Sequence, residues 1–180
     1  MKKTFKKLMA ALLAVALLCA MAVPAFAAEG SGSITIDKAI DGETYTAYKI
    51  FDVVSFKEEA DSSKTYVYTV AKGWTAFFEQ NDVKDYVSVD AHGQPTWITG
   101  KDSGTDLQAF AKLALNYASK TKTITGTTAT AVDNQAVING LTAGYYVVST
   151  TAGSLCILNT NGDDLTIDEK NVAPTIDKKI

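Results

Sequence analysis

The chain of 180 residues contains no Arg, and all 17 of its basic residues are Lys. Four of these lysines lie at positions 2, 3, 6 and 7, so the rest of the chain holds 13 Lys against 20 Asp and Glu. A nucleic-acid-binding surface or a membrane-surface patch needs clustered basic side chains to neutralise phosphates. The acidic balance therefore argues against both kinds of partner.

After residue 27 the chain contains only one cysteine, Cys156, and only one histidine, His92. One thiol excludes an intramolecular disulfide, and one Cys with one His cannot build a His/Cys metal site. The sequence also has no nucleophile elbow and no phosphate-binding glycine loop. We therefore expect no metal, no cofactor and no enzymatic activity.

The N-terminus has the three parts of a secretory signal peptide. A basic segment at residues 2–7 is followed by an apolar run at residues 8–23, Pro24, and the small-x-small sequence Ala25-Phe26-Ala27. This pattern predicts cleavage after Ala27 and a secreted protein, the alternative being an uncleaved anchor helix. No apolar run after residue 28 is long enough to span a bilayer.

The remaining chain is rich in Thr, Val, Ile and Tyr with frequent Gly, Asn and Asp, which favours strands and turns. Asn161-Gly162 is a strong tight-turn signal and predicts a hairpin joining the last two strands. The expected strands are Ser33–Ile40, Thr44–Phe56, Thr65–Val70, Tyr86–Val89, Thr121–Thr125, Gln135–Ile138, Tyr145–Thr151, Ser154–Asn159 and Asp164–Ile167.

Two segments have helical periodicity. Apolar residues recur at helical spacing from Asp106 to Lys120, and a shorter helix around Trp74, Phe77 and Phe78 places three aromatic side chains on one face. Both are expected to cover a sheet. Many short strands with two helices predict a mainly β protein, an immunoglobulin-like β-sandwich with inserted helices, over residues 28–173.

An internal repeat marks the end of this domain. Thr35–Ile40 recurs as Thr175–Ile180 with five of six residues identical, 140 positions further on, and Pro174 precedes the second copy. That spacing is the size of one domain. Residues 174–180 are therefore predicted to be the first strand of a second immunoglobulin-like domain, and the sequence to be the N-terminal part of a longer protein.

The repeat contains a lysine flanked by isoleucines. With a strand period of two, Lys38 shares a face with Ile36 and Ile40, and Lys178 takes the same place in the second copy. Burying an ammonium group is costly, so a lysine on a core-facing surface should have a lowered pKa and act as a neutral, nucleophilic amine. The alternative is an edge-strand lysine whose amine reaches water.

Three segments resemble the N-terminal domain of Gram-positive sortase-assembled major pilins: Thr44–Asp52, Leu141–Val148 and Glu169–Lys179. The resemblance implies a shaft subunit of a covalently assembled fimbria, joined to other pilin subunits by a sortase, fixed to the cell wall and able to contact a host surface.

The resemblance also implies site residues. Lys38 would join Asn171 through an intramolecular isopeptide bond, with release of ammonia, and Lys178 would be the corresponding lysine of the second domain. Lys170 would accept the sortase-bound end of the next subunit. Ser149 and Thr150 stand where related domains carry Glu, so the acid that assists the isopeptide bond is left unassigned.

Two other interpretations remain open. A secreted adhesin module binding carbohydrate or host matrix protein would need an exposed aromatic platform, for which Trp97 is the one candidate. A secreted hydrolase would use His92, which lies in a polar segment containing Gly and Pro.

Overall fold

The computed structural model describes residues 32–58, 64–150, 155–160 and 164–169, and within these ranges the chain is mainly β. Three helices interrupt the strands. In chain order the elements are β1 (Gly32–Asp37), β2 (Thr44–Glu58), β3 (Lys64–Val70), α2 (Thr75–Phe78), α3 (Asn81–Lys84), β4 (Val87–Val89), β5 (Pro95–Trp97), α4 (Gly104–Lys120), β6 (Thr127–Thr130), β7 (Gln135–Leu141), β8 (Gly144–Thr150), β9 (Leu155–Thr160) and β10 (Leu165–Asp168).

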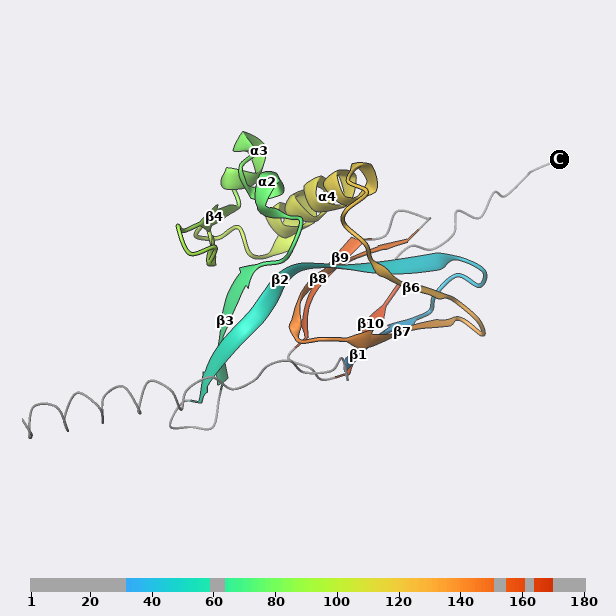
Figure 1. Cartoon of the computed structure of the whole chain (residues 1–180). Coiled ribbons are helices and arrows are strands. Elements are labelled where there is room, and N and C mark those ends of the chain that lie inside the picture. Colours follow the sequence, from blue (N-terminus) through green and yellow to red (C-terminus); the bar gives the residue numbers. More distant parts are fainter. Residues whose placement is uncertain (1–31, 59–63, 151–154, 161–163, 170–180) are drawn as a thin grey trace, which may run out of the picture.

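The elements form three layers (Figure 1). A three-stranded sheet has the order β10-β1-β7, and a larger sheet has the order β3-β2-β8-β9 with β6 also paired to β2. One group of buried residues, here called the inter-sheet core, joins strands of both sheets. A second group, the helix-side core, joins the larger sheet to α2 and α4. The architecture is consistent with a β-sandwich carrying a helical layer.

Strand alternation builds the inter-sheet core. Ile34 and Ile36 of β1 are 0% and 1% exposed, and the side chain of Thr35 between them points away from the core. From the larger sheet Tyr45 and Tyr146 pack against them. The phenol oxygen of Tyr45 accepts a hydrogen bond from the backbone N–H of Ile40 (3.0 Å), so this buried hydroxyl has a partner.

Aromatic side chains dominate the helix-side core. Trp74, Phe77 and Phe110 are fully buried, with ring centroids 5.3 Å apart for Trp74–Phe77 and 5.7 Å apart for Phe77–Phe110. This confirms both predicted helices as cover for a sheet. Burial raises the pKa of Tyr145, which faces this core from β8, to about 12.

Strand β2 lies between the two cores, so its alternate side chains serve both, with Ala47 in the inter-sheet core and Tyr48 packed against the helix-side core, and a β-bulge then changes this alternation. The pairing of β2 with β8 shifts register between Lys49 and Phe51, and Ile50 and Phe51 are both buried in the helix-side core although they are neighbours. The extra residue places two neighbouring side chains on the same side of the sheet, so the residues after the bulge face opposite to their counterparts before it. Before the bulge Ala47 contributes to the inter-sheet core, and after it Phe51 packs under the helices.

Two sequence predictions are wrong. Residues 121–125 form no strand, because Ile124 turns into the helix-side core and the strand begins at Thr127. The predicted hairpin between the last two strands is also wrong, because β9 pairs with β8 in the larger sheet whereas β10 pairs with β1 in the other. A turn signal reports local chain reversal, but the choice of sheet depends on residues far away in sequence.

The first and last of the described strands, β1 and β10, lie side by side and run parallel. The register pairs Thr35 with Thr166, Ile36 with Ile167, and Asp37 with Asp168, so two identical tripeptides face each other. Because the two strands are parallel, the chain begins β1 at one end of the sheet and leaves β10 at the opposite end.

Candidate functional site

Lys38 lies directly after β1, at the end of the sheet where β10 also ends. Its Nζ lies 2.5 Å from Oδ2 of Asp168. Gln135 of β7 donates from Nε2 to Oδ1 of Asp37 (2.8 Å), and the backbone N–H of Glu169 donates to the carbonyl oxygen of Asp37 (2.8 Å). The two neighbouring carboxylates are thus each held by a side chain from another strand or turn.

The structure decides between the two interpretations of Lys38, because its amine reaches water and the buried, neutral amine is wrong. The side chain of Lys38 is 71% exposed, and the backbone has φ 58°. This left-handed conformation ends the strand at Asp37 and interrupts the alternation, so Ala39 rather than Lys38 is buried. The hydrogen bond and charge of Asp168 raise the pKa of Lys38, which is the opposite of the predicted direction.

The isopeptide bond between Lys38 and Asn171 was expected for a buried neutral amine, and the exposed, ion-paired amine of Lys38 argues against it, although no described residue tests the bond itself. Asn171, Lys170 and Lys178 lie outside the described residues. Asp168 is the carboxyl group that sequence reasoning missed beside Lys38. No signal in the sequence placed it there, because β1 and β10 are paired across 131 positions of the chain.

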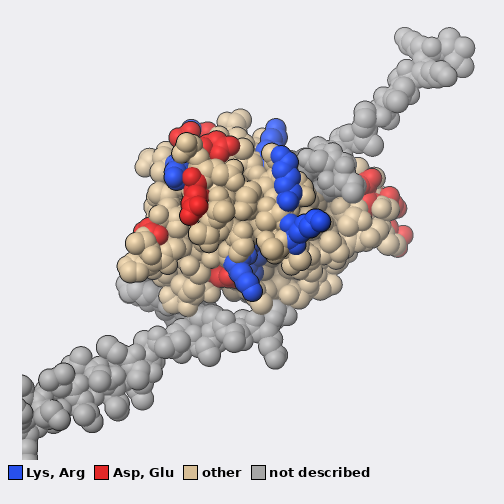
Figure 2. Space-filling model, turned by 45° about the horizontal axis from the view of Figure 1, so that its top comes forward, with Lys and Arg blue, Asp and Glu red and all other residues tan. Residues whose placement is uncertain are grey.

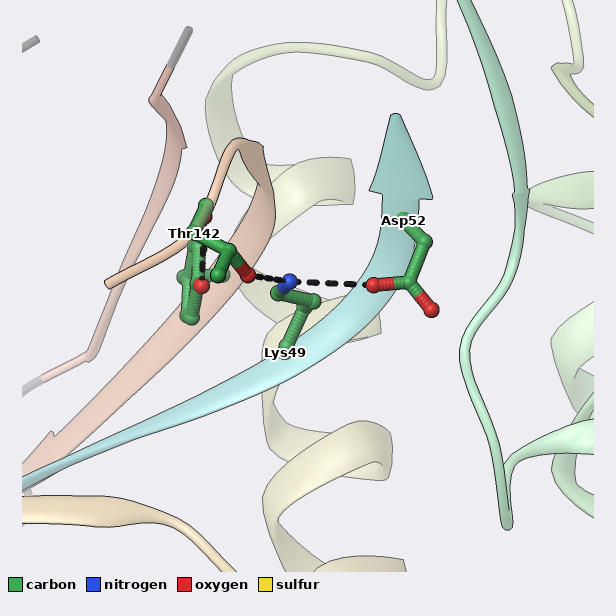
Figure 3. Close-up of polar contacts among 4 residues, drawn as sticks. Lys49, Asp52 and Thr142 are labelled. Carbon is green, nitrogen blue, oxygen red and sulfur yellow. Dashed lines mark hydrogen bonds and ion pairs between the residues drawn. The ribbon is translucent and has the colours of Figure 1, made fainter. Parts of the chain in front are cut away.

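A second polar group lies where β2 meets the turn between β7 and β8. The Lys49 cluster consists of Lys49 and Asp52 of β2 and Thr142 of the turn (Figure 3), together with Tyr146 of β8. Lys49 Nζ contacts Oδ1 of Asp52 (3.0 Å) and donates to Oγ1 of Thr142. The phenol of Tyr146 donates to the carbonyl oxygen of Thr142 (2.7 Å), and Nζ lies 5.6 Å from the centre of that ring.

The Lys49 cluster fastens the β7–β8 turn to β2. The side chain of Lys49 is 21% exposed, and its stem lies beside Gly144 at the start of β8. All four side chains belong to Thr44–Asp52 or Leu141–Val148, two of the segments that carry the pilin resemblance. The sequence does not predict that the two segments meet, because the contact between Lys49 and Thr142 spans 93 residues.

Trp97 does not form an open aromatic platform. It is partly buried in the helix-side core, with its ring centroid 5.0 Å from Phe110 and 5.9 Å from Tyr145. His92 is exposed in the loop between β4 and β5. Asp90 accepts hydrogen bonds from the backbone N–H groups of Gln94 and His92, which lower its pKa, so this carboxylate shapes the loop.

No protein-family model and no curated protein sequence matches this chain. Within the described ranges, no three or more His, Cys, Asp and Glu side chains are grouped to hold a metal ion, and no helix is long and apolar enough to cross a membrane. On the face drawn in Figure 2, a short row of basic side chains lies among acidic ones and gives no broad basic surface.

We predict that Gly144→Ala destabilises the domain. An added Cβ would lie 2.6 Å from the carbonyl oxygen of Phe51 and 3.1 Å from the stem of Lys49, so backbone must shift. We expect a loss of about 2 kcal/mol or more in the free energy of unfolding measured by urea denaturation.

Gly140→Ala is the control, because it has φ 74° but nothing within 4 Å of an added Cβ. It should cost only the dihedral penalty of roughly 1 kcal/mol. An equal or larger loss for Gly140→Ala would contradict the close approach of β2 and β8.

The exposure of Lys38 also predicts the mass of the folded protein. Amide formation requires a neutral amine in a dry site, and Lys38 is exposed and paired with a carboxylate. We expect the intact mass of the chain from Ala28 to equal its sequence mass. A mass lower by one ammonia, restored in both Lys38→Ala and Asn171→Ala, would show that the bond forms despite this geometry.

Proposed function

We propose that this chain is the N-terminal domain of a structural subunit of a covalently assembled fimbria on a Gram-positive cell surface. The observation that carries the proposal is the path of the chain. β1 and β10 are parallel neighbours, so the chain passes from one end of the domain to the other. A subunit of this form suits a serial arrangement in a fibre.

The sequence beyond β10 supports the same arrangement. Six residues after Glu169 begins the segment Thr175–Ile180, which repeats Thr35–Ile40, that is, the last three residues of β1 and the three that follow. A second domain beginning with the same strand would extend the chain in the direction in which β10 leaves the first. We infer a row of related domains.

The resemblance to sortase-assembled pilins supplies the chemistry of assembly. The two resembling segments on β2 and on β7–β8 are joined in space by the Lys49 cluster. In the proposed reaction a lysine amine attacks the thioacyl carbonyl that links a sorting peptide to the sortase cysteine. An amide forms and the thiol leaves. Lys170, next after the described residue Glu169, is the proposed acceptor.

An adhesin module is the alternative function. Its requirement for an exposed aromatic platform finds no support at Trp97, which packs against Phe110 and Tyr145. The fimbrial subunit is therefore the better supported proposal.

The test is transfer of an acyl donor in vitro. The chain from Ala28 is incubated with the pilin-polymerising sortase of the source organism and a Leu-Pro-x-Thr-Gly peptide. We expect one peptide, without its glycine, to be joined to the chain by an amide that tandem mass spectrometry places at Lys170. Lys170→Arg should abolish the product.

Lys101→Arg is the matched control and should leave the yield unchanged, since it also replaces one lysine by a charged residue that cannot form the amide. Cleavage of the donor peptide, measured in the same reaction, shows that the sortase is active. An active sortase that joins no peptide to any lysine of the chain would contradict the proposed function.

A further inference from the structure

The pair β1–β10 has the geometry of a strand pair that resists tension along its own axis. The two strands are parallel over four residue pairs, from Ile34 opposite Leu165 to Asp37 opposite Asp168. β10 is the last described strand and lies at the edge of its sheet, so the rest of the chain continues from it. We propose that β1–β10 is a shear-loaded clamp through which the body of the domain holds tension that leaves along the C-terminal chain.

Side chains tie this strand pair at both ends. At its beginning, the hydroxyl of Ser33 donates to Oδ1 of Asp164 (2.8 Å). At its end, Lys38 holds Asp168, and the backbone N–H of Glu169 donates to the carbonyl of Asp37. These three contacts connect residues 131, 130 and 132 positions apart, so each joins the last described segment to the first.

The direction of load decides how such a pair fails. Tension on the C-terminal chain pulls β10 along its length, and the evenly spaced hydrogen bonds of a parallel ladder then share the load. A load applied across the strands instead opens the ladder one bond at a time from one end. The force at which a domain unfolds is governed by its unfolding rate under that force. When several hydrogen bonds share the force, this rate should be lower than when the bonds break one after another.

This inference goes beyond the proposed function and does not need a sortase. The clamp bears tension that passes through the body of the domain and leaves along β10. In the fibre proposed above, the link at Lys170 bypasses the clamp, which then acts only on tension applied to the N-terminal part of the domain. The mechanical measurement below therefore stands or fails separately from the acyl-transfer experiment.

Single-molecule force spectroscopy on one domain with two pulling geometries tests the clamp. In the first, the chain from Ala28 is held by its N- and C-terminal ends. In the second, it is held by a cysteine replacing Val132 and by its C-terminal end, with Cys156→Ser in both proteins so that the attached thiol is unique.

Val132 is 66% exposed and bridges to Gln135, which lies opposite Asp37 at the end of the sheet where β10 leaves. The second geometry therefore peels β10 from its C-terminal end. We expect a clearly higher unfolding force when the chain is held by its two ends. Equal forces in the two geometries, or a higher force in the second, would overturn the clamp.

Lys38→Met tests the tie at the end of the clamp, with Lys101→Met as its matched control. Lys101 forms a comparable ion pair with Asp106 (2.8 Å) outside the clamp. Under end-to-end load we expect Lys38→Met to raise the unfolding rate roughly two- to fivefold, the range of an exposed ion pair, and Lys101→Met to leave it unchanged. Equal effects of the two substitutions would overturn the role of Lys38 in the clamp.

Discussion

The pairing of the first strand with the last is the constraint on which the rest of the domain depends. β1 lies between β7 and β10, and its isoleucines form the centre of the inter-sheet core. Without β10 the strand carrying Ile34 and Ile36 would be left at a sheet edge with unpaired backbone groups. The pairing also decides that the chain leaves at the opposite end from where it begins, which is the basis for the proposed serial arrangement of domains.

A second junction makes the layered architecture possible. One long strand, β2, contributes to both cores because its alternate side chains face opposite sides of the larger sheet, and a bulge near Lys49 adds Phe51 to the helix-side core beside Ile50. The Lys49 cluster fastens the β7–β8 turn at that position, and Gly144 allows the two backbones to approach. The segments that resemble a pilin therefore have a physical role of their own, because they hold the larger sheet in register where the helical layer begins.

The sequence predicted those parts of the fold in which local periodicity and tertiary burial agree. The helix ending at Lys120 and the aromatic face of Trp74, Phe77 and Phe78 were predicted correctly because their apolar residues recur every three or four positions and pack into one core.

The sequence left the exposure of Lys38 open, because a strand period of two does not reveal that a positive φ at this residue ends the strand. The sheet to which β10 belongs could not be read from Asn161-Gly162, since its partner is set by contacts 131 positions away. The carboxyl group of Asp168 beside Lys38 could not be predicted for the same reason.

The most direct test of this account is nuclear Overhauser spectroscopy of the chain from Ala28, with assigned methyl and backbone protons of both terminal strands. The account predicts cross-strand contacts between Thr35 and Thr166 and between Ile36 and Ile167, in the pattern of a parallel ladder. It also predicts that β10 shows no ladder to β9. An antiparallel pattern joining Leu155–Thr160 to Leu165–Asp168, with no contact from β10 to Ile36, would contradict the account.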